Sequence, residues 1–327
     1  IILNPNYTSA HTNLGIALKE MDRLEEAEES YNRALILNPK SKSTLLNRWE
    51  LFYKKKQYEA ALRDSDLCDT RISRQRSLVT LYAMGRIQEV YERIEILFKS
   101  DSKNIEIAAF SAFLSNIEKK HTSNNFCNNP MDFIYFNNIS SHLDNSSMFI
   151  EELIKELQNV ETTWEPSNKS TRKGFQTPSN LNLFETQSKK IMQIKSIINN
   201  ELDTYYNKFK NENCSFIQKW PSKKNLHGWH VILKHQGYQK PHIHSNGWLS
   251  GVIYLKVVPS LGRNEGSIEF SLNGGENYTN INSPKLVHQP KPGDIVFFPS
   301  SLHHRTIPFT KNTDRIIISF DLIPNNN

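Results

Sequence analysis

The stretch GYQKPHIH, residues 237–244, contains His242 and His244, with a single residue between them. On an extended segment, residues at this spacing point to the same face of the chain. A third histidine, His304, follows sixty residues after His244, and Arg315 follows eleven residues after that. A histidine from a distant strand can close a metal site against the first two, and an arginine offers a fixed cation to a carboxylate. The pattern predicts a non-haem iron site that works with an acidic cosubstrate.

The sequence around these histidines consists of short apolar runs separated by Gly and Pro. Runs of this length and spacing predict a β-sandwich or jelly roll. The expected strands are residues 229–234, 242–244, 251–258, 267–271, 295–298 and 315–322. A further short strand is expected after residue 131, supporting helices at 149–157 and 184–209, and a loop at 164–182.

The N-terminal part of the chain contains an internal repeat. The pair Asn4-Pro5 recurs as Asn38-Pro39, a period of 34 residues. Between the two pairs, the small residues Gly15 and Ala27 allow two helices to approach closely, and Tyr31 fills the space beside them. This pattern resembles the tetratricopeptide repeat. Two weaker copies follow at residues 45–69 and 78–102, and residues 105–117 are expected to form a capping helix.

Repeats of this kind bury a core only by stacking on one another, and their concave face usually binds peptides or protein partners. A protein or peptide partner is therefore expected for the repeat region. The alternative is that the repeats only brace the following domain or mediate dimerisation.

The chain is expected to be an α+β multidomain protein. Residues 1–120 form the tetratricopeptide-repeat array, with residues 1–5 as the tail of an earlier repeat. The Asn-rich, polar segment 121–130 is the expected linker. Residues 131–327 form the double-stranded β-helix, or jelly roll, with its supporting helices.

Composition limits the possible partners and compartment. The chain has 327 residues and a net charge of +6, and no run of Lys or Arg is longer than three, so nucleic-acid binding is not expected. The sequence contains no stretch of eighteen apolar residues, so no membrane span is expected. The three cysteines, Cys68, Cys127 and Cys214, are odd in number and widely spaced, and predict neither a disulfide framework nor a zinc site. A reducing compartment, the cytoplasm, is expected.

Eight of the eleven histidines lie between His227 and His304. Together with four ordered motifs, they give residues 131–327 a recognisable pattern. The motifs are Gly-x4-His-x-His ending at residue 244, WLSGVIYL at 248–255, KPGDIVFFP at 291–299, and His-x10-Arg-Ile-Ile-Ile-Ser-Phe starting at 304. This pattern resembles the 2-oxoglutarate/Fe(II)-dependent oxygenase superfamily. More narrowly, it is similar to a group of oxygenases that is related to prolyl hydroxylases and is sometimes fused to tetratricopeptide repeats.

The resemblance implies roles for individual residues. His242 matches the first histidine of the family's His-x-Asp/Glu motif, and His304 matches the distal histidine. His303 should face the other side of the strand. Arg315 matches the residue that grips the distal carboxylate of 2-oxoglutarate, and Tyr254 matches a tyrosine that often hydrogen-bonds the same carboxylate.

The departure from the family pattern is His244, which stands where the superfamily normally has a carboxylate. The favoured hypothesis is a three-histidine iron site made by His242, His244 and His304. In the competing hypothesis Glu269 or Asp294 completes the triad, although Pro-Gly-Asp before a strand is an ordinary turn. A metal-poor pseudo-enzyme, or a site for another metal, is the third possibility.

With Fe(II), 2-oxoglutarate and O2, the resemblance implies oxidative decarboxylation to succinate and CO2, coupled to hydroxylation of a C–H bond. Trp229 and Trp248 are candidates for the pocket lining, with burial in the sandwich core as the alternative. Two other readings stay open. A cupin-type metalloprotein would need a glutamate soon after the two histidines, and residues 245–251 contain none. A non-catalytic scaffold would join partner-binding repeats to an inactive jelly roll.

Overall fold

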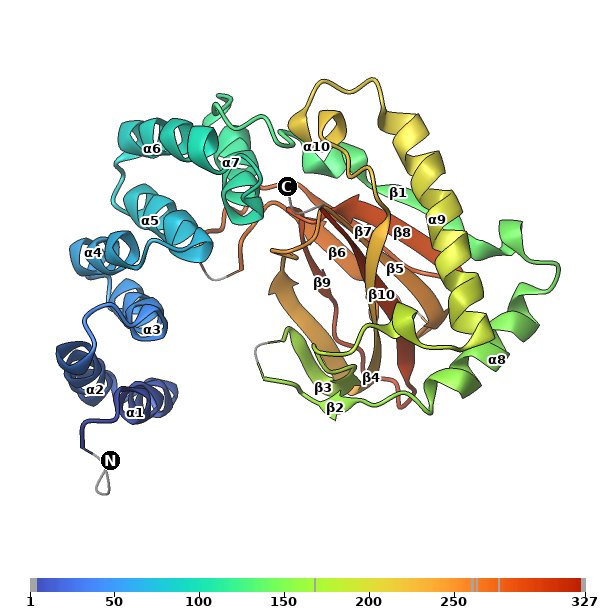
Figure 1. The fold of residues 1–327 in the computed structure, drawn as a ribbon, viewed down its shortest axis with the longest axis horizontal. Coiled ribbons are helices and arrows are strands. Elements are labelled where there is room, and N and C mark those ends of the chain that lie inside the picture. Colours follow the sequence, from blue (N-terminus) through green and yellow to red (C-terminus); the bar gives the residue numbers. More distant parts are fainter. Residues whose placement is uncertain (1–4, 168, 260–261, 263, 276, 325–327) are drawn as a thin grey trace. The chain divides into compact units, whose positions relative to one another are not determined.

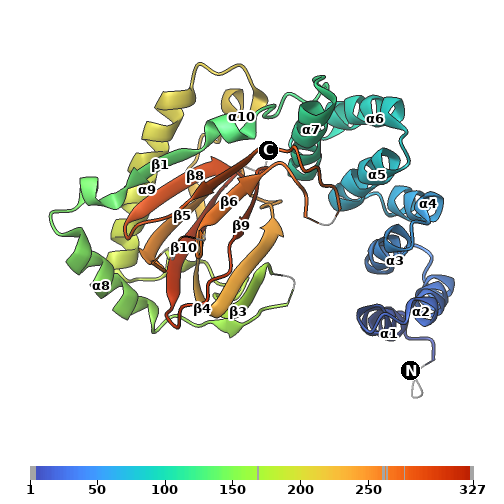
Figure 2. The same cartoon turned by 180° about the vertical axis from the view of Figure 1, so that it is seen from behind.

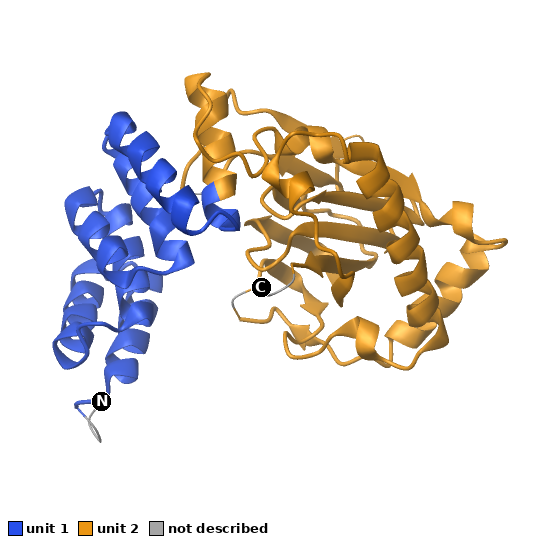
Figure 3. Ribbon diagram, turned by 45° about the horizontal axis from the view of Figure 1, so that its top comes forward, with its two compact units in different colours: residues 1–107 blue, residues 108–327 orange. Residues whose placement is uncertain are grey.

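The computed structural model describes residues 5–324, apart from residues 168, 260, 261, 263 and 276. The expected tail of an earlier repeat therefore lies, except for Pro5, outside the described residues. The chain divides into two compact units, Ile1–Ile107 and Ala108–Asn327 (Figure 3). Each unit is described separately below.

The first unit is a succession of helix pairs (Figure 1). This architecture confirms the predicted tetratricopeptide-like array. Each helix ends at a short turn that leads into the next one. The six helices are α1 (Thr8–Glu20), α2 (Leu24–Leu37), α3 (Lys42–Lys54), α4 (Tyr58–Cys68), α5 (Arg71–Ala83) and α6 (Ile87–Ser100).

Neighbouring pairs are joined through buried side chains. Trp49 of α3 is buried, and its indole Nε1 donates a hydrogen bond of 3.0 Å to Thr80 Oγ1 of α5. The Arg76 guanidinium lies 4.3 Å from the centre of the Trp49 ring. Because each pair completes the core of the next one, the repeats stabilise one another by stacking.

The first pair depends on Gly15, which lies in α1 against the ring of Tyr31 in α2. A Cβ atom at Gly15 would lie 2.5 Å from Tyr31 Cε1, too close for van der Waals contact. Gly15→Ala is therefore expected to destabilise the first unit by about 1–3 kcal/mol, although alanine favours a helix by ~1 kcal/mol. Urea unfolding followed by circular dichroism measures the change. In a Tyr31→Leu background, Gly15→Ala should reduce the free energy of unfolding by less. A Gly15→Ala protein more stable than the wild type would show that Tyr31 does not exclude a side chain at this position.

Helix α7 (Ile105–Glu118) spans the division between the units, which falls after Ile107 rather than after residue 120. Within the second unit, Phe110 and Phe113 of α7 pack against Tyr278, with ring centres 5.1 and 4.8 Å apart. Residues 121–130, the expected linker, also belong to this unit, and Phe126 is fully buried there. Aromatic packing, which polarity alone does not reveal, ties both segments to the second unit.

The second unit is built on a curled antiparallel sheet (Figures 1 and 2). Its order is β1-β8-β5-β10-β4-β9-β6-β7, and β3 adds to β4 and to β2. This sheet confirms the predicted jelly-roll architecture. The strands are β1 (Tyr135–Asn138), β2 (Thr163–Trp164), β3 (Thr171–Gln176), β4 (Asn225–His242), β5 (Leu249–Lys256), β6 (Ile268–Ser271), β7 (Lys285–His288), β8 (Asp294–Pro299), β9 (His303–Thr306) and β10 (Arg315–Ile323).

Strand β4 connects the two parts of the sheet. Its first half, residues 225–233, pairs with β10, whereas Gln239 and His242 pair with β9. Strand β3 pairs with both halves. The loop predicted at 164–182 was therefore wrong in part, because the polar sequence TRKGFQ lacks the apolar alternation by which strands are recognised.

Helices cover one face of this sheet. The long helix α9 (Lys189–Phe209) lies in front of the sheet in Figure 1 and behind it in Figure 2. Tyr205 of α9 packs 5.8 Å from Phe297 of β8, measured between ring centres. Because alternate residues of a strand face opposite sides, Phe298 points to the other face, the interior of the jelly roll. The remaining helices are α8 (Ser146–Leu157), α10 (Ser215–Gln218) and the short 3-10 turns η1 (Pro130–Phe133), η2 (Ile139–His142) and η3 (Leu183–Glu185).

Among the described residues, no helix combines the length and the apolar character that crossing a membrane requires.

Candidate metal centre

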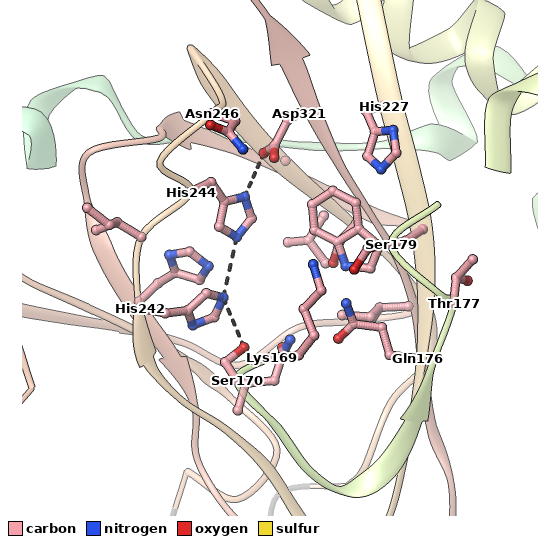
Figure 4. Close-up of a pocket in the computed structure, with 18 of the residues that line it drawn as sticks. Lys169, Ser170, Gln176, Thr177, Ser179, His227, His242, His244, Asn246 and Asp321 are labelled. Carbon is pink, nitrogen blue, oxygen red and sulfur yellow. Dashed lines mark hydrogen bonds and ion pairs between the residues drawn. The ribbon is translucent and has the colours of Figure 1, made fainter. Parts of the chain in front are cut away.

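Three histidines meet inside the jelly roll. His242 is the last residue of β4 and pairs directly with His304 of β9, while His244 follows two residues after the end of β4. Their candidate ligand nitrogens all lie within 4.8 Å of one another. The Nε2 atoms of His242 and His244 are 3.3 Å apart, and Figure 4 shows both rings on one side of a cavity. Three converging imidazoles offer the nitrogen ligands that iron and similar transition metals bind.

Each of the three rings has an oxygen acceptor on its Nδ1 side. His242 Nδ1 lies 2.7 Å from the Lys240 carbonyl oxygen, and His304 Nδ1 lies 3.1 Å from that of Leu302. His244 Nδ1 lies 2.6 Å from a carboxylate oxygen of Asp321. A carbonyl oxygen can only accept, so these contacts place the proton on Nδ1 and leave the Nε2 lone pair available for a metal.

Burial keeps His242 and His304 neutral. It lowers the pKa of His242 to about 3, and the neighbouring His244 adds to this effect. Burial, together with His242 and His244, also holds the pKa of His304 well below its ordinary value. A neutral imidazole is the form that binds metal ions.

The adjacent His303 points to the opposite side of β9. Its ring centre lies 5.7 Å from that of Tyr278, and burial lowers its pKa to about 4. This is the orientation that strand alternation predicts. The two neighbouring histidines therefore occupy different environments, and only His304 is part of the cluster.

The two carboxylates considered as alternative ligands lie elsewhere. Glu269 accepts hydrogen bonds of 2.8 and 3.0 Å from Arg305. Asp294 accepts hydrogen bonds from Asn138 and from the backbone of Lys291. The carboxylate that does contact the cluster is Asp321, which the sequence reasoning missed. A signal was present, because Asp321 stands at an even spacing from Arg315 on a mostly apolar strand.

Arg315 and Tyr254 lie in the same cavity as the histidines, which has a volume of about 740 Å³. Arg315 is 1% exposed, and its Nε donates to the Gly266 carbonyl oxygen at 2.9 Å. Within the described part of the chain, neither its buried Nη1 nor the buried Tyr254 hydroxyl has a hydrogen-bond partner, and the guanidinium lies 5.0 Å from the centre of the Tyr254 ring. Burial lowers the pKa of the Arg315 guanidinium and raises that of Tyr254 to about 12.

No described carboxylate forms an ion pair with this guanidinium. A buried cation without a counter-ion is costly, so this arrangement fits an anionic ligand. The arginine and the hydroxyl both present N–H or O–H donors, which a carboxylate accepts. The residues therefore suit a carboxylate-bearing cosubstrate that also reaches the three histidines.

The two tryptophans considered for the pocket lie in different places. Trp229 lines the cavity, and its ring centre lies 5.4 Å from that of His244. Trp248 is buried in the core, where it stacks on Phe216 and donates a hydrogen bond of 2.9 Å to the Phe216 carbonyl oxygen. The opposite wall of the cavity contains Gln176 and His227 (Figure 4).

Comparisons with known proteins agree with this geometry. Residues 227–321 match the family model described as "Putative 2OG-Fe(II) oxygenase", and residues 8–41 match the tetratricopeptide repeat model. No curated protein sequence matches the chain.

Several solved structures are similar to parts of the chain. A Pseudomonas putida prolyl-4-hydroxylase is 12% identical and aligns over 59% of this chain and 93% of its own, with a TM-score of 0.40. HygX from Streptomyces hygroscopicus, solved with nickel and 2-oxoglutarate, is 11% identical over 59% of this chain and 83% of its own, with a TM-score of 0.41. YrrB, a tetratricopeptide-repeat protein with an unusual peptide-binding site, is 14% identical over 36% of this chain and 63% of its own, with a TM-score of 0.31.

The histidine cluster, Arg315 and Tyr254 all lie within the segment that matches the oxygenase model. The chain thus contains one segment that matches the tetratricopeptide repeat model and another that matches the 2OG-Fe(II) oxygenase model.

Proposed function

We propose that the second unit is an Fe(II)- and 2-oxoglutarate-dependent dioxygenase that hydroxylates a C–H bond in a protein or peptide. His242, His244 and His304 hold the iron through Nε2. Arg315 and Tyr254 bind the carboxylate of 2-oxoglutarate that lies away from the metal. When bound, the iron and 2-oxoglutarate would activate O2, so that one oxygen atom enters the C–H bond and the other enters succinate, with release of CO2.

The protein contributes position and surroundings. The carbonyl oxygens of Lys240 and Leu302 orient two of the imidazoles. Arg315 provides a planar set of donors that orients a carboxylate as well as binding it. Apolar side chains such as Phe298, whose ring centre lies 4.5 Å from that of His304, keep the interior side of the site dry.

The observation that carries this proposal is the pair of unsatisfied donors, Arg315 Nη1 and Tyr254 Oη, in the cavity of the three histidines. A cupin-type metal site does not require such a buried cation. An inactive scaffold would have no reason to retain one, because replacing it by an apolar side chain would stabilise the fold.

The test is an anaerobic titration of the purified chain with Fe(II) and then 2-oxoglutarate. A weak visible charge-transfer band of the chelate, followed by succinate release when air is admitted, is the expected result. Iron binding without the band and without succinate would favour a cupin-like site. Failure to bind iron would favour the scaffold.

The polar wall of the cavity supports a substrate that forms hydrogen bonds. Gln176, Thr177, Ser179 and Asn246 line it together with Trp229. A peptide offers amide donors and acceptors to such a wall. Succinate release should therefore rise with a peptide library, and mass spectrometry should find one added oxygen atom in the peptides that bind. Stimulation by small metabolites alone would contradict the peptide assignment.

We also propose that the first unit recruits this protein substrate. The repeat match at residues 8–41 supports a partner-binding role. A second pocket of about 270 Å³ is lined by Asp66, Arg74 and Arg93 among others. Arg93→Glu in the full chain should raise the KM for a protein substrate without changing turnover of its excised peptide. An equal effect on both would point to the catalytic unit instead. The cytoplasm stays our proposed location, and cell fractionation tests it.

A further inference from the structure

We propose that Asp321 acts through His244 to supply the negative charge that the family pattern places on the metal ligand itself. Asp321 would be a positioning residue that orients His244 and strengthens its Nε2 as a donor. This inference rests on the proposed metal centre. It explains how the site can hold a divalent metal although a histidine stands where a carboxylate is usual.

The contact is short and buried. Asp321 Oδ1 lies 2.6 Å from His244 Nδ1, and Asp321 is 8% exposed. Ser250 Oγ donates to the same oxygen at 2.7 Å and lies 2.9 Å from His244 Nδ1. Ser300 Oγ lies 2.8 Å from Ser250 Oγ, and both serines are fully buried. The carboxylate is therefore fixed from several sides.

The fold builds this contact from three segments. Asp321 of β10 pairs directly with Ser250 of β5, which in turn pairs with Phe298 of β8. The turn that follows His244 passes close by, because a Cβ atom at Gly247 would lie 2.5 Å from Ser300 Oγ and 3.0 Å from Asp321 Cγ. Only a residue without a side chain fits there, and this lets His244 approach Asp321.

Asp321 does not take the place of a direct ligand. It contacts Nδ1, whereas Nε2 of the same ring lies 3.3 Å from His242 Nε2, on the side where the three histidines converge. The imidazole therefore stands between the carboxylate and the candidate metal position. In metal sites, a carboxylate in this position fixes the tautomer and raises the basicity of the histidine.

Only one of the three histidines has a charged acceptor. His242 and His304 donate to backbone carbonyls, which are neutral. Hydrogen bonds to a carboxylate are shorter and stronger than those between neutral groups, as the 2.6 Å distance at His244 reflects. The charged acceptor thus stands behind the one ligand that departs from the family pattern.

The experiment measures the dissociation constant for Mn(II) of the full chain by following the signal of the free ion. Asp321→Asn should weaken Mn(II) binding by about 10–100-fold, the usual effect of removing such a partner. Asp294→Asn is the matched control, because Asp294 lies 3.2 Å from His288 in another His–Asp pair that is not part of the cluster. It should leave the dissociation constant unchanged.

A double-mutant cycle shows whether the effect passes through His244. His244→Asp places a carboxylate directly on the metal, so Asp321→Asn should no longer weaken binding in that background. If Asp321→Asn reduced Mn(II) affinity equally in the wild type and in His244→Asp, Asp321 would act on the fold in general, and the inference would be overturned. Equally tight binding by the wild type and Asp321→Asn would also overturn it.

A measurement on the wild type alone covers the case in which Asp321→Asn does not fold. In the zinc-loaded protein, the Nδ1 proton of His244 should be slow to exchange and should resonate further downfield than those of His242 and His304. Absence of a proton on His244 Nδ1 would overturn the inference and leave the metal centre intact. A wild type that binds no metal would overturn the proposed function and this inference with it.

Discussion

Replacing His304 by alanine is expected to abolish Fe(II) binding. His304 provides one of three converging nitrogens, and two remaining imidazoles from one short segment cannot enclose the metal. The metal-dependent increase in melting temperature measures the effect, because a ligand that binds only the folded state stabilises it in proportion to its affinity. The wild type should melt at a higher temperature with Fe(II) under anaerobic conditions, and His304→Ala should not respond.

His303→Ala is the matched control. It removes the same buried side chain from the neighbouring position, where the ring packs against Tyr278 rather than against the cluster. This variant should melt at a lower temperature without metal and still respond to Fe(II). The prediction would be wrong if His304→Ala still showed the full rise in melting temperature with Fe(II), or if only His303→Ala lost it. Either result would mean that β9 presents His303, and not His304, to the metal site.

Replacing Arg315 by methionine is expected to abolish the response to 2-oxoglutarate while leaving Fe(II) binding in place. Loss of a buried charged contact costs about 2–5 kcal/mol of binding energy, which corresponds to a factor of about thirty or more in the dissociation constant. The same substitution should stabilise the protein without cosubstrate, by about 1–4 kcal/mol, because it removes a buried cation that has no counter-ion among the described residues. Thermal melting with and without 2-oxoglutarate gives both values.

Arg305→Met is the control for this experiment. Arg305 lies on β9 but forms its ion pair with Glu269, outside the cavity. The 2-oxoglutarate response should survive in this variant. If Arg315→Met still binds 2-oxoglutarate with the affinity of the wild type, the assignment of the carboxylate to Arg315 is wrong.

The sequence was sufficient for the architecture because its signals are periodic. The spacing of small and aromatic residues around Gly15 and Tyr31 indicated the helical repeats. The short apolar runs separated by Gly and Pro indicated the longer strands of the sheet. The convergence of His242, His244 and His304 could be expected because an extended segment turns alternate residues to one side.

The features that were missed depend on tertiary contacts. Strand β3 is polar and gains its place by pairing with both halves of β4. The segment 121–130 looks like a linker, yet Phe126 is buried against Phe216 and Trp248. Asp321 stands 77 residues from His244, and only the register between β10 and β5 brings it near the cluster. The even spacing from Arg315 indicates the face of β10 on which Asp321 lies, but no local pattern encodes its contact with His244.

Arg315, a buried cation for which the described residues provide no counter-ion, has a consequence for the lifetime of the protein in the cell. Without cosubstrate, the second unit carries a destabilising charge in its interior, so a larger fraction of molecules is unfolded at any moment and open to proteases. Binding of 2-oxoglutarate removes this weakness. We expect the half-life of the protein to be longer when 2-oxoglutarate is abundant than when it is scarce.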